Sequence, residues 1–243
     1  MRAARLADYA GGELLAMAGA ENYYRWILRT CRRHLGRVVL EHGAGLGTVS
    51  RHLLREPIER LVALEPAANL VPLLTERLAP WRERVEVVPS TLEETTDRLR
   101  GRGIDTIVSV NVLEHIPNDC RTLRAMWEIL PDGGRIILFV PALPWLYSSL
   151  DRSLEHARRY GRRELRKKAV GAGFTIVADR YMNLPGVAAW WLAGRLLGSR
   201  SLSPRAVRLY DRFAIPLVSA LERLRPPPVG QSLLLVGQRS TAG

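Results

Sequence analysis

Short runs of β-branched and apolar residues alternate with helix-compatible stretches along most of this 243-residue chain. Strands and helices that alternate in this way are typical of a mainly parallel sheet that helices cover on both faces. We therefore predict a single α/β domain, because the chain is long enough to bury one such core and short for two. The predicted strands are residues 37–41, 61–65, 85–89, 104–110, 135–140, 173–179 and 231–238.

The first predicted strand runs directly into a glycine-rich turn, and residues 41–47 read E-H-G-A-G-L-G. Glycines at 43, 45 and 47 permit a tight turn and let a ligand lie against bare backbone, and the next helix begins with unpaired N–H groups. Glu65 ends the second strand, where a carboxylate can accept hydrogen bonds from both hydroxyls of a ribose. These two features predict a nucleoside-containing cofactor at the carboxyl edge of the sheet.

The spacing of the glycines, and the acid before them, indicate which cofactor this is. A dinucleotide fingerprint reads G-x-G-x-x-G and fits a pyrophosphate, whereas this turn reads G-x-G-x-G after Glu41. A carboxylate at that position disfavours a phosphate and suits a cationic or amino-bearing ligand. We infer S-adenosylmethionine, whose sulfonium and amino groups are positive.

With these residues the chain resembles the class I S-adenosylmethionine-dependent methyltransferases, over about residues 21–238. Residues 41–47, 63–66, 105–116 and 130–135 are similar to four motifs of that family, in the family's order. The resemblance implies a Rossmann-like, doubly wound sheet of seven strands in the order 3-2-1-4-5-7-6, with the last strand antiparallel, and S-adenosylhomocysteine as the product. The cofactor-binding residues that it implies are Tyr23, Glu41, Gly43, Ala44, Gly45, Gly47, Glu65, Pro66, Thr91, Leu92, Asn111 and Val112.

Two of these cofactor contacts are less well defined than the rest. Where the family usually has an aspartate for the adenine amino group, this chain reads Ser90, Thr91, Leu92. We expect the backbone of Thr91 or Leu92 to replace that contact. At the other end of the cofactor, Tyr23 either closes over the methionine portion or packs within its own helix, and we favour the first.

Segments beyond the fifth strand resemble a narrower group of bacterial members. The shared patterns are P-A-L-P-W-L-Y at 141–147, H-A-R-R-Y at 156–160, the N-L-P-G and W-W of 183–191, and G-Q-S-L at 230–233. We associate that group with natural-product, small-molecule and cell-envelope sugar or lipid biosynthesis. The resemblance therefore implies a small-molecule acceptor.

Methyl transfer mainly requires that the nucleophile, the methyl group and the sulfur are aligned, and it needs a base only where the acceptor must lose a proton. His115 and Glu114, beyond the fourth strand, are the first candidates for catalysis, and His156 and Tyr160 are the second. His115 would also suit a structural, hydrogen-bonded role under its loop. We expect no metal site, because neither cysteine has a partner at metal-ligand spacing.

The chain has 36 basic and 24 acidic side chains, and its formal charge of +12 first indicates nucleic acid or an anionic membrane as partner. Residues 1–150 hold 19 basic and 18 acidic side chains, and residues 151–243 hold 17 and 6, so the excess lies in the C-terminal part. The basic cluster at 158–168 is either the solvated face of a helix or a site for an anionic group. We expect a small acceptor, anionic or lipid-linked, with peripheral membrane contact left open, and not nucleic acid.

The predicted domain divides into three consecutive segments. Residues 1–35 form an N-terminal helical cap, 36–142 the cofactor-binding core and 143–243 the acceptor-side segment. The last segment contains an insert at 183–229, whose long helix Pro216 should kink, followed by the last strand. The sequence shows no signal peptide and no uncharged run long enough to span a membrane, so we expect a cytoplasmic location.

We expect transfer of a methyl group from S-adenosylmethionine to a small molecule, most readily at oxygen, with nitrogen or an aromatic carbon such as an indole left open. An RNA methyltransferase would suit the charge, but the chain shows neither an added RNA-binding module nor an N-P-P-[YFW] motif for a flipped base. A non-catalytic binding module with a vestigial cofactor fold is the second alternative.

Overall fold

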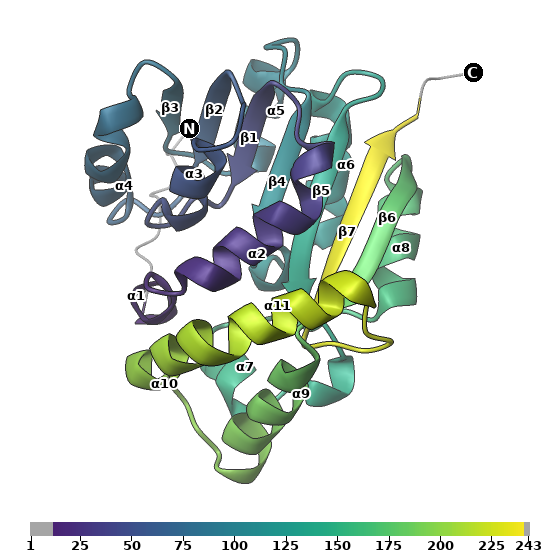
Figure 1. Cartoon of the computed structure of the whole chain (residues 1–243). Helices are drawn as coiled ribbons and strands as arrows, with labels where there is room; N and C mark the ends of the chain where they lie inside the picture. Colours follow the sequence, from purple (N-terminus) through teal and green to yellow (C-terminus); the bar gives the residue numbers. More distant parts are fainter. Residues whose placement is uncertain (1–11, 241–243) are drawn as a thin grey trace.

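Seven strands form one sheet in the order β3-β2-β1-β4-β5-β7-β6, which confirms the predicted order (Figure 1). The computed structural model describes residues 12–240, so part of the predicted N-terminal cap, residues 1–11, lies outside the described residues. β7 runs antiparallel to both of its neighbours, and the remaining pairs are parallel. The strands are β1 Val38–His42, β2 Arg60–Leu64, β3 Val85–Val88, β4 Thr106–Val110, β5 Arg135–Pro141, β6 Phe174–Met182 and β7 Ser232–Arg239.

Helices cover both faces of this sheet. α2, α3, α4 and α11 pack on one face, and α5, α6 and α8 pack on the other. The α-helices are α1 Gly12–Met17, α2 Glu21–Cys31, α3 Thr48–Leu53, α4 Val71–Leu78, α5 Leu92–Leu99, α6 Asp119–Ile129, α7 Ser149–Ser153, α8 Arg162–Gly171, α9 Leu184–Trp190, α10 Pro204–Leu209 and α11 Ile215–Leu224.

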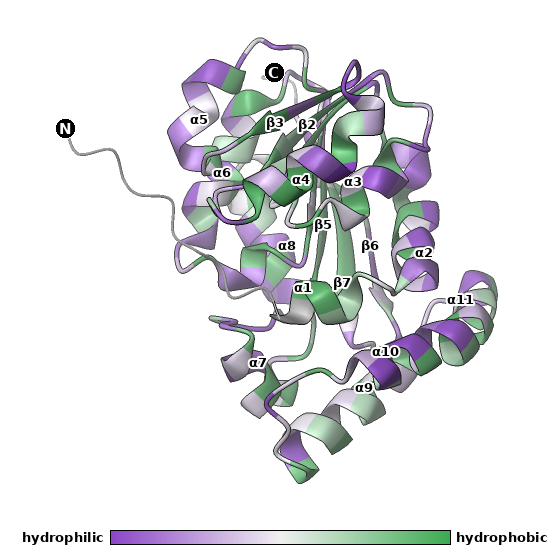
Figure 2. Cartoon of the chain, turned by 90° about the vertical axis from the view of Figure 1, so that its left-hand side faces the viewer, coloured by the Kyte–Doolittle hydropathy of each residue, from purple (hydrophilic) through white to green (hydrophobic). Residues whose placement is uncertain are grey.

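Alternate residues of the central strands point into two separate hydrophobic cores, because successive side chains of a strand face opposite ways. In β5, Ile137 and Phe139 pack with residues of α2, α3 and α11. Ile136, Leu138 and Val140 pack with residues of α5, α6 and α8. Since both faces are covered, β5 is a continuous apolar run, and Figure 2 shows such green strands between helices of mixed hydropathy.

The chain leaves the neighbouring strands β1 and β4 toward opposite faces of the sheet. The turn after β1 leads to α3 on one face, and the loop after β4 leads through a short turn of helix, η3 (Leu113–His115), to α6 on the other. A sheet of this kind opens a crevice at such a point, beyond the carboxyl ends of the two strands. A ligand site is therefore expected between residues 43–47 and residues 111–115.

A helical insert, residues 183–229, connects β6 to β7 at the lower end of the molecule (Figure 1). α9 continues into a π-helical stretch, η5 (Trp191–Leu196), and a second π-helical stretch, η6 (Tyr210–Ala214), joins α10 to α11. The second stretch precedes Pro216, which has no N–H to donate and whose ring crowds the carbonyl four residues earlier. The irregularity predicted at Pro216 thus takes the form of a widened turn. Within residues 12–240, no helix combines the length and the apolar character that crossing a bilayer requires.

Asp211 joins the insert to α2, although 188 positions separate it from Tyr23. Its buried carboxylate accepts hydrogen bonds from the backbone N–H of Tyr23 at 2.8 Å and of Asn22 at 3.2 Å. The residue before α2, Ala20, makes no side-chain cap. Asp211 therefore supplies both the missing acceptor and a negative charge at the positive end of the helix.

We expect Asp211→Ala to lower the free energy of unfolding by about 2 kcal/mol, because it leaves two N–H donors without their acceptor. Asp97→Ala is the matched control: the Asp97 side chain is 96 % exposed and pairs with Arg100 in the next turn. The control should change stability by less than about 0.5 kcal/mol. Urea unfolding measures both variants, and equal stabilities would contradict the role of Asp211.

Candidate active site

The turn between β1 and α3 has a conformation that glycine adopts most easily. Gly43, Gly45 and Gly47 have φ angles of +76°, +54° and +74°, in the left-handed region where other side chains are strained. A Cβ at Gly43 would lie 2.5 Å from a methyl carbon of Val112, so the loop after β4 also requires bare backbone there. The turn thus presents backbone in place of side chains at the carboxyl edge of the sheet.

Glu65 follows β2 directly, and its carboxylate holds the glycine-rich turn. Oε2 accepts a hydrogen bond from the backbone N–H of Gly45 at 2.6 Å, and Oε1 accepts one from Ala67 at 2.8 Å. Burial raises the pKa of the carboxyl group, although the two N–H donors favour its charged form. A carboxylate can accept about four hydrogen bonds. Each oxygen therefore retains a lone pair that a ribose hydroxyl could use.

Glu41 is a buried acid in β1 that reaches the same region. The hydroxyl of Ser50, in α3, donates to its Oε2 at 2.5 Å. Burial raises the pKa of Glu41 to about 8, and the charge of Glu65 adds to the shift. A cation bound beside such a carboxylate favours its charged form, so Glu41 fits the amino group of S-adenosylmethionine and would repel a phosphate.

A cavity of about 540 Å³ extends from the glycine-rich turn to the helical insert. Its lining includes residues predicted to bind the cofactor as well as residues predicted to act in catalysis. The predicted residues that line it are Tyr23, Glu41, Gly43, Ala44, Gly45, Asn111, Glu114, His115 and His156. The predicted residues outside the lining are Gly47, Glu65, Pro66, Thr91, Leu92, Val112 and Tyr160.

Some of the residues outside the lining make other contacts. Thr91 caps α5, since its hydroxyl accepts from the N–H of Glu94 while its own N–H donates to the Glu94 carboxylate. Leu92 is fully buried in the core. The fully buried Tyr160 donates its hydroxyl to Oδ2 of Asp119 at 2.8 Å. The Thr91 N–H would have to leave Glu94 to contact adenine, and Tyr160 faces the protein interior.

Titratable side chains gather at the other end of the cavity. Nδ1 of His156 lies 3.0 Å from Oδ1 of Asp151. The rings of His115 and His156 meet edge to face with their centres 4.8 Å apart. Proton-accepting atoms of Glu114, His115 and His156 all lie within 4.8 Å of one another. Such atoms can accept protons, and since they are also a donor set for divalent metals, the expectation of a metal-free site stays a prediction.

Burial sets the protonation of this cluster. It raises the pKa of Glu114 to about 7. Burial is the largest cause that lowers the pKa of His115 to about 4, which makes His115 a weak base at neutral pH. Although burial opposes it, hydrogen bonds from His156 and Trp190 and the charge of Arg159 hold the pKa of Asp151 below its usual value. Asp151 is therefore charged at neutral pH and orients the ring of His156.

Arg159 lines the cavity, although the basic cluster at 158–168, of which it is part, was predicted to be either a solvated helix face or a site for an anionic group. The structure buries Arg159 to 3 % exposure, because its guanidinium lies over the indole ring of Trp190, 4.9 Å from the ring centre. Its Nε lies 3.4 Å from Oδ1 of Asp151. The only sequence signal for this role was its place in H-A-R-R-Y, next to Tyr160.

Glu114 and Arg159 have unmet hydrogen-bonding capacity. Both carboxylate oxygens of Glu114, and all three guanidinium nitrogens of Arg159, lack a hydrogen-bond partner among the described residues. Both side chains line the cavity. Because buried polar groups in folded proteins normally have partners, a bound molecule with a donor and an acceptor would complete them.

Residues of the insert also line the cavity. Trp190 and Ala193 come from α9 and η5, and Val207, Tyr210 and Asp211 come from α10 and η6. The hydroxyl of Tyr210 donates to the side-chain carbonyl of Asn183 at 2.6 Å and so ties this helix to the end of β6. The insert therefore contributes both apolar and polar side chains to the cavity.

Comparisons with known proteins agree with this geometry. A family model described as a methyltransferase domain matches residues 18–179. A search of curated protein sequences returned no match.

Solved structures of similar fold include an S-adenosylmethionine-dependent methyltransferase from Archaeoglobus fulgidus, with a TM-score of 0.62 and 16 % identity over 93 % of this chain and 99 % of that one. Geranyl diphosphate C-methyltransferase from Streptomyces coelicolor has a TM-score of 0.62 and 14 % identity, over 87 % of this chain and 76 % of that one. The 1,6-didemethyltoxoflavin-N1-methyltransferase from Burkholderia thailandensis has a TM-score of 0.60 and 20 % identity, over 95 % of this chain and 83 % of that one. At these identities the likeness shows a shared fold.

We expect Gly45→Arg to abolish binding of S-adenosylhomocysteine, because the new side chain would occupy the cavity beside the turn. Gly101→Arg is the matched control, since Gly101 also has a positive φ, +75°, and an added Cβ there meets nothing within 4 Å. The control should keep the affinity within about twofold. Calorimetric titration measures both variants. A similar loss in the control would assign the effect to backbone strain and remove the argument for the cavity.

We expect binding of S-adenosylmethionine to release a proton through Glu41 near pH 7. With a pKa of about 8, Glu41 is mostly protonated at that pH in the free protein. A bound cation lowers this pKa, so the proton leaves on binding. Calorimetry in buffers of different ionisation enthalpy counts the protons, and Glu41→Gln should remove that contribution. The same proton count in wild type and variant would refute this placement of the cofactor.

Proposed function

The chain belongs to the S-adenosylmethionine-dependent methyltransferases, and on this premise we propose that it methylates a small-molecule acceptor at an oxygen atom. When bound, S-adenosylmethionine supplies an activated methyl group on a sulfonium sulfur, and S-adenosylhomocysteine is the product. The observation that carries the proposal is that Glu114 and Arg159 are buried, line the cavity that begins at the glycine-rich turn, and have polar atoms without a hydrogen-bond partner among the described residues.

The residues at the carboxyl ends of β1 and β2 fit the cofactor. Glu65 would accept hydrogen bonds from the ribose, and Glu41 would face the cationic amino group. Tyr23, buried against Phe139 with ring centres 5.9 Å apart, would close the methionine end. Asn111 holds a strained backbone with φ of +53° directly after β4, in the loop that would pass the methyl group of a bound cofactor.

The acceptor end of the cavity favours a small molecule with a polar head. Arg159 would donate to an anionic or carbonyl oxygen, and Glu114 would accept from a hydroxyl or amine. A cavity of about 540 Å³ leaves limited room beside the cofactor. Two enzymes of similar fold carry small molecules in their names, geranyl diphosphate and 1,6-didemethyltoxoflavin. An anionic or lipid-linked acceptor would match Arg159 best.

His156 is the group that we assign as general base. Asp151 holds Nδ1 of the ring, so Nε2 is left to take the proton of an acceptor hydroxyl. By taking that proton, His156 would leave the acceptor oxygen free to accept the methyl group that a bound cofactor would supply. The charge of Asp151 stabilises the imidazolium that results. His115 is neutral at neutral pH, and its ring supports the His156 ring by packing against it.

We expect labelled methyl from S-adenosylmethionine to enter a small-molecule or lipid fraction of a cell extract. His156→Ala should lower kcat about 100-fold with little change in cofactor affinity, because only proton transfer is lost. Asp151→Asn should shift the pH profile of kcat/KM as well as lower kcat. His52→Ala, a buried histidine of α3 that does not line the cavity, is the matched control.

Label that entered RNA would contradict this proposal in favour of an RNA methyltransferase. Cofactor binding without transfer to any fraction would favour a non-catalytic binding module. Equal turnover of wild type and His156→Ala would leave catalysis to alignment alone and remove the assignment of the base.

A further inference from the structure

The helical insert carries a row of large apolar side chains that no described residue covers. Leu209, Phe213, Leu217 and Leu221 follow one another at intervals of four along α10, η6 and α11, and Leu224 ends the row. They are between 58 % and 85 % exposed. Other exposed apolar side chains lie on η5 and beside it: Trp191, Leu192, Leu196 and Leu197.

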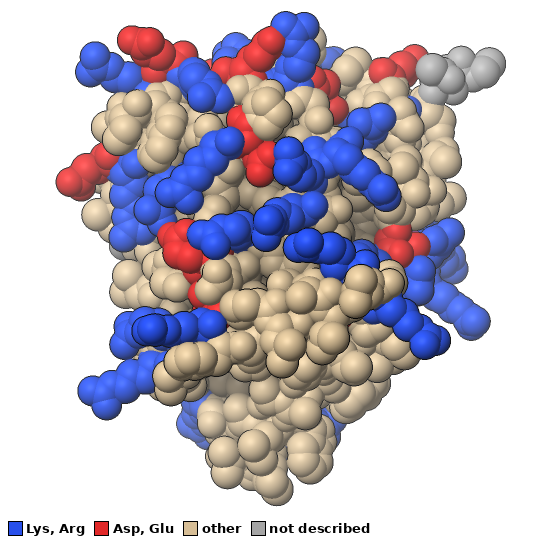
Figure 3. All heavy atoms as spheres, viewed as in Figure 1, with Lys and Arg blue, Asp and Glu red and all other residues tan. Residues whose placement is uncertain are grey.

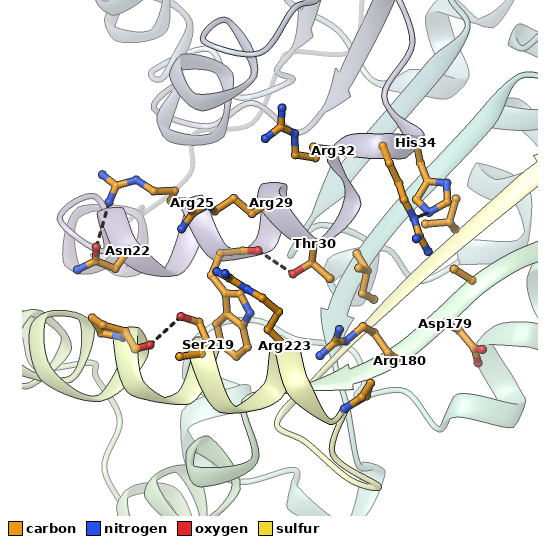
Figure 4. Close-up of a pocket in the computed structure, with 18 residues that line it drawn as sticks. Asn22, Arg25, Arg29, Thr30, Arg32, His34, Asp179, Arg180, Ser219 and Arg223 are labelled. Atoms are coloured by element: carbon orange, nitrogen blue, oxygen red, sulfur yellow. Dashed lines mark hydrogen bonds between the residues drawn. The ribbon is translucent and has the colours of Figure 1, made fainter.

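A groove lined with arginines lies beside this row. It measures about 870 Å³ and runs between α2 and α11, over β6 and β7 (Figure 4). Arg25 and Arg29 come from α2, Arg180 from β6 and Arg223 from α11. Further lining comes from two more arginines, Arg32 and Arg33, and from apolar side chains of the floor, including Trp26, Leu234 and Val236.

Three arginines of the groove lack an acidic partner among the described residues, whereas Arg32 pairs with Glu56 at 3.8 Å. Arg25, Arg29 and Arg223 form no ion pair with any residue from 12 to 240, although Arg25 donates a hydrogen bond to the side chain of Asn22. Asp179 also lines the groove, but it is already paired with arginines of α8. Uncompensated arginines around an apolar floor favour an anionic partner that also has an apolar part.

Figure 3 shows an uncharged surface next to a basic one on a single face of the molecule. The lower end, formed by the helices of the insert, is mostly tan, and blue Lys and Arg side chains border it on the side of α2. Apolar side chains beside a basic border suit the surface of a bilayer. Such a helix buries its apolar side at the boundary of headgroups and acyl chains, while arginines contact lipid phosphates.

We propose that the insert and the arginine groove dock this enzyme on an anionic phospholipid membrane, and that its methyl acceptor is an amphiphile held there. The statement about the acceptor rests on the proposed function, and the statement about docking does not. The helix that carries the apolar row also lines the acceptor cavity, through Val207 and Tyr210. Docking through this helix therefore brings the cavity close to the membrane.

The same features disfavour other occupants of this face. RNA would use the arginines but would leave the row from Leu209 to Leu224 in water. A second copy of the chain would cover the row but would bring two uncompensated arginine grooves toward each other, which like charges oppose. An anionic bilayer satisfies both the apolar row and the charge.

The test is co-sedimentation of the full chain with vesicles of phosphatidylcholine alone or mixed with phosphatidylglycerol. We expect binding to the mixed vesicles only, weakening as salt rises. The double variant Leu217→Asp, Leu221→Asp should lower partitioning at least about tenfold. Arg25→Ala and Arg29→Ala should each lower it about fivefold.

Matched controls separate this face from the rest of the surface. Leu73→Asp changes a leucine of α4 that is 46 % exposed, and the double variant Arg121→Ala, Arg124→Ala removes two exposed arginines of α6. Both should leave vesicle binding within about twofold. Every variant should keep its affinity for S-adenosylhomocysteine, which shows that it is folded and that the cofactor site is intact.

Several results would overturn the docking proposal. One is no sedimentation of the wild type with mixed vesicles. Another is that the double variant Leu217→Asp, Leu221→Asp sediments with mixed vesicles as the wild type does, which would indicate unspecific adsorption by charge. Binding of RNA in place of vesicles, or a dimer that the same double variant dissociates, would assign the face to those partners. If the protein bound vesicles but methyl label entered only water-soluble products, the docking would stand and the amphiphilic acceptor would be ruled out.

Discussion

The carboxylate of Asp211 accepts hydrogen bonds from the N–H groups of Asn22 and Tyr23, and the cavity and the arginine groove both depend on that contact. It holds the beginning of α2 against a helix that follows much later in the chain. On one side of α2, Tyr23 then becomes part of the cavity that contains the glycine-rich turn. On another side, the arginines of α2 face α11 across the groove. One charged helix cap thus positions the walls of both the reaction site and the proposed membrane surface.

The cavity contains ionisable groups whose charged forms folding by itself does not favour. Glu41, Glu114 and Arg159 are almost completely buried, and an incompletely paired buried charge costs several kcal/mol. The raised pKa values of Glu41 and Glu114 express the same cost, because protonation removes the buried charge. A cationic cofactor and a polar acceptor would supply the missing partners. Groups that destabilise the free protein are therefore the ones that recognise its ligands.

The distribution of charge in space differs from its distribution along the chain. Counted along the sequence, the positive excess lies after residue 150. In the structure, many basic side chains of the cluster at 158–168 pair with Asp119 or Asp179, and Arg159 is buried. The groove instead combines arginines of α2, from the nearly neutral part of the chain, with arginines of β6 and α11. Segment totals could not show this, because packing decides which charges share a surface.

The sequence by itself determined the seven strands, the glycine-rich turn and the position of Glu65, because each depends on local periodicity or on residue types at fixed short spacings. The strand order came from the family resemblance that those segments carry. Only the tertiary structure decided that Arg159 is buried in the site, that Tyr160 faces Asp119, and that Asp211 caps α2. Each of these contacts joins segments far apart in the chain. The packing of whole helices determines which side chains are buried, and a local sequence pattern does not contain that information.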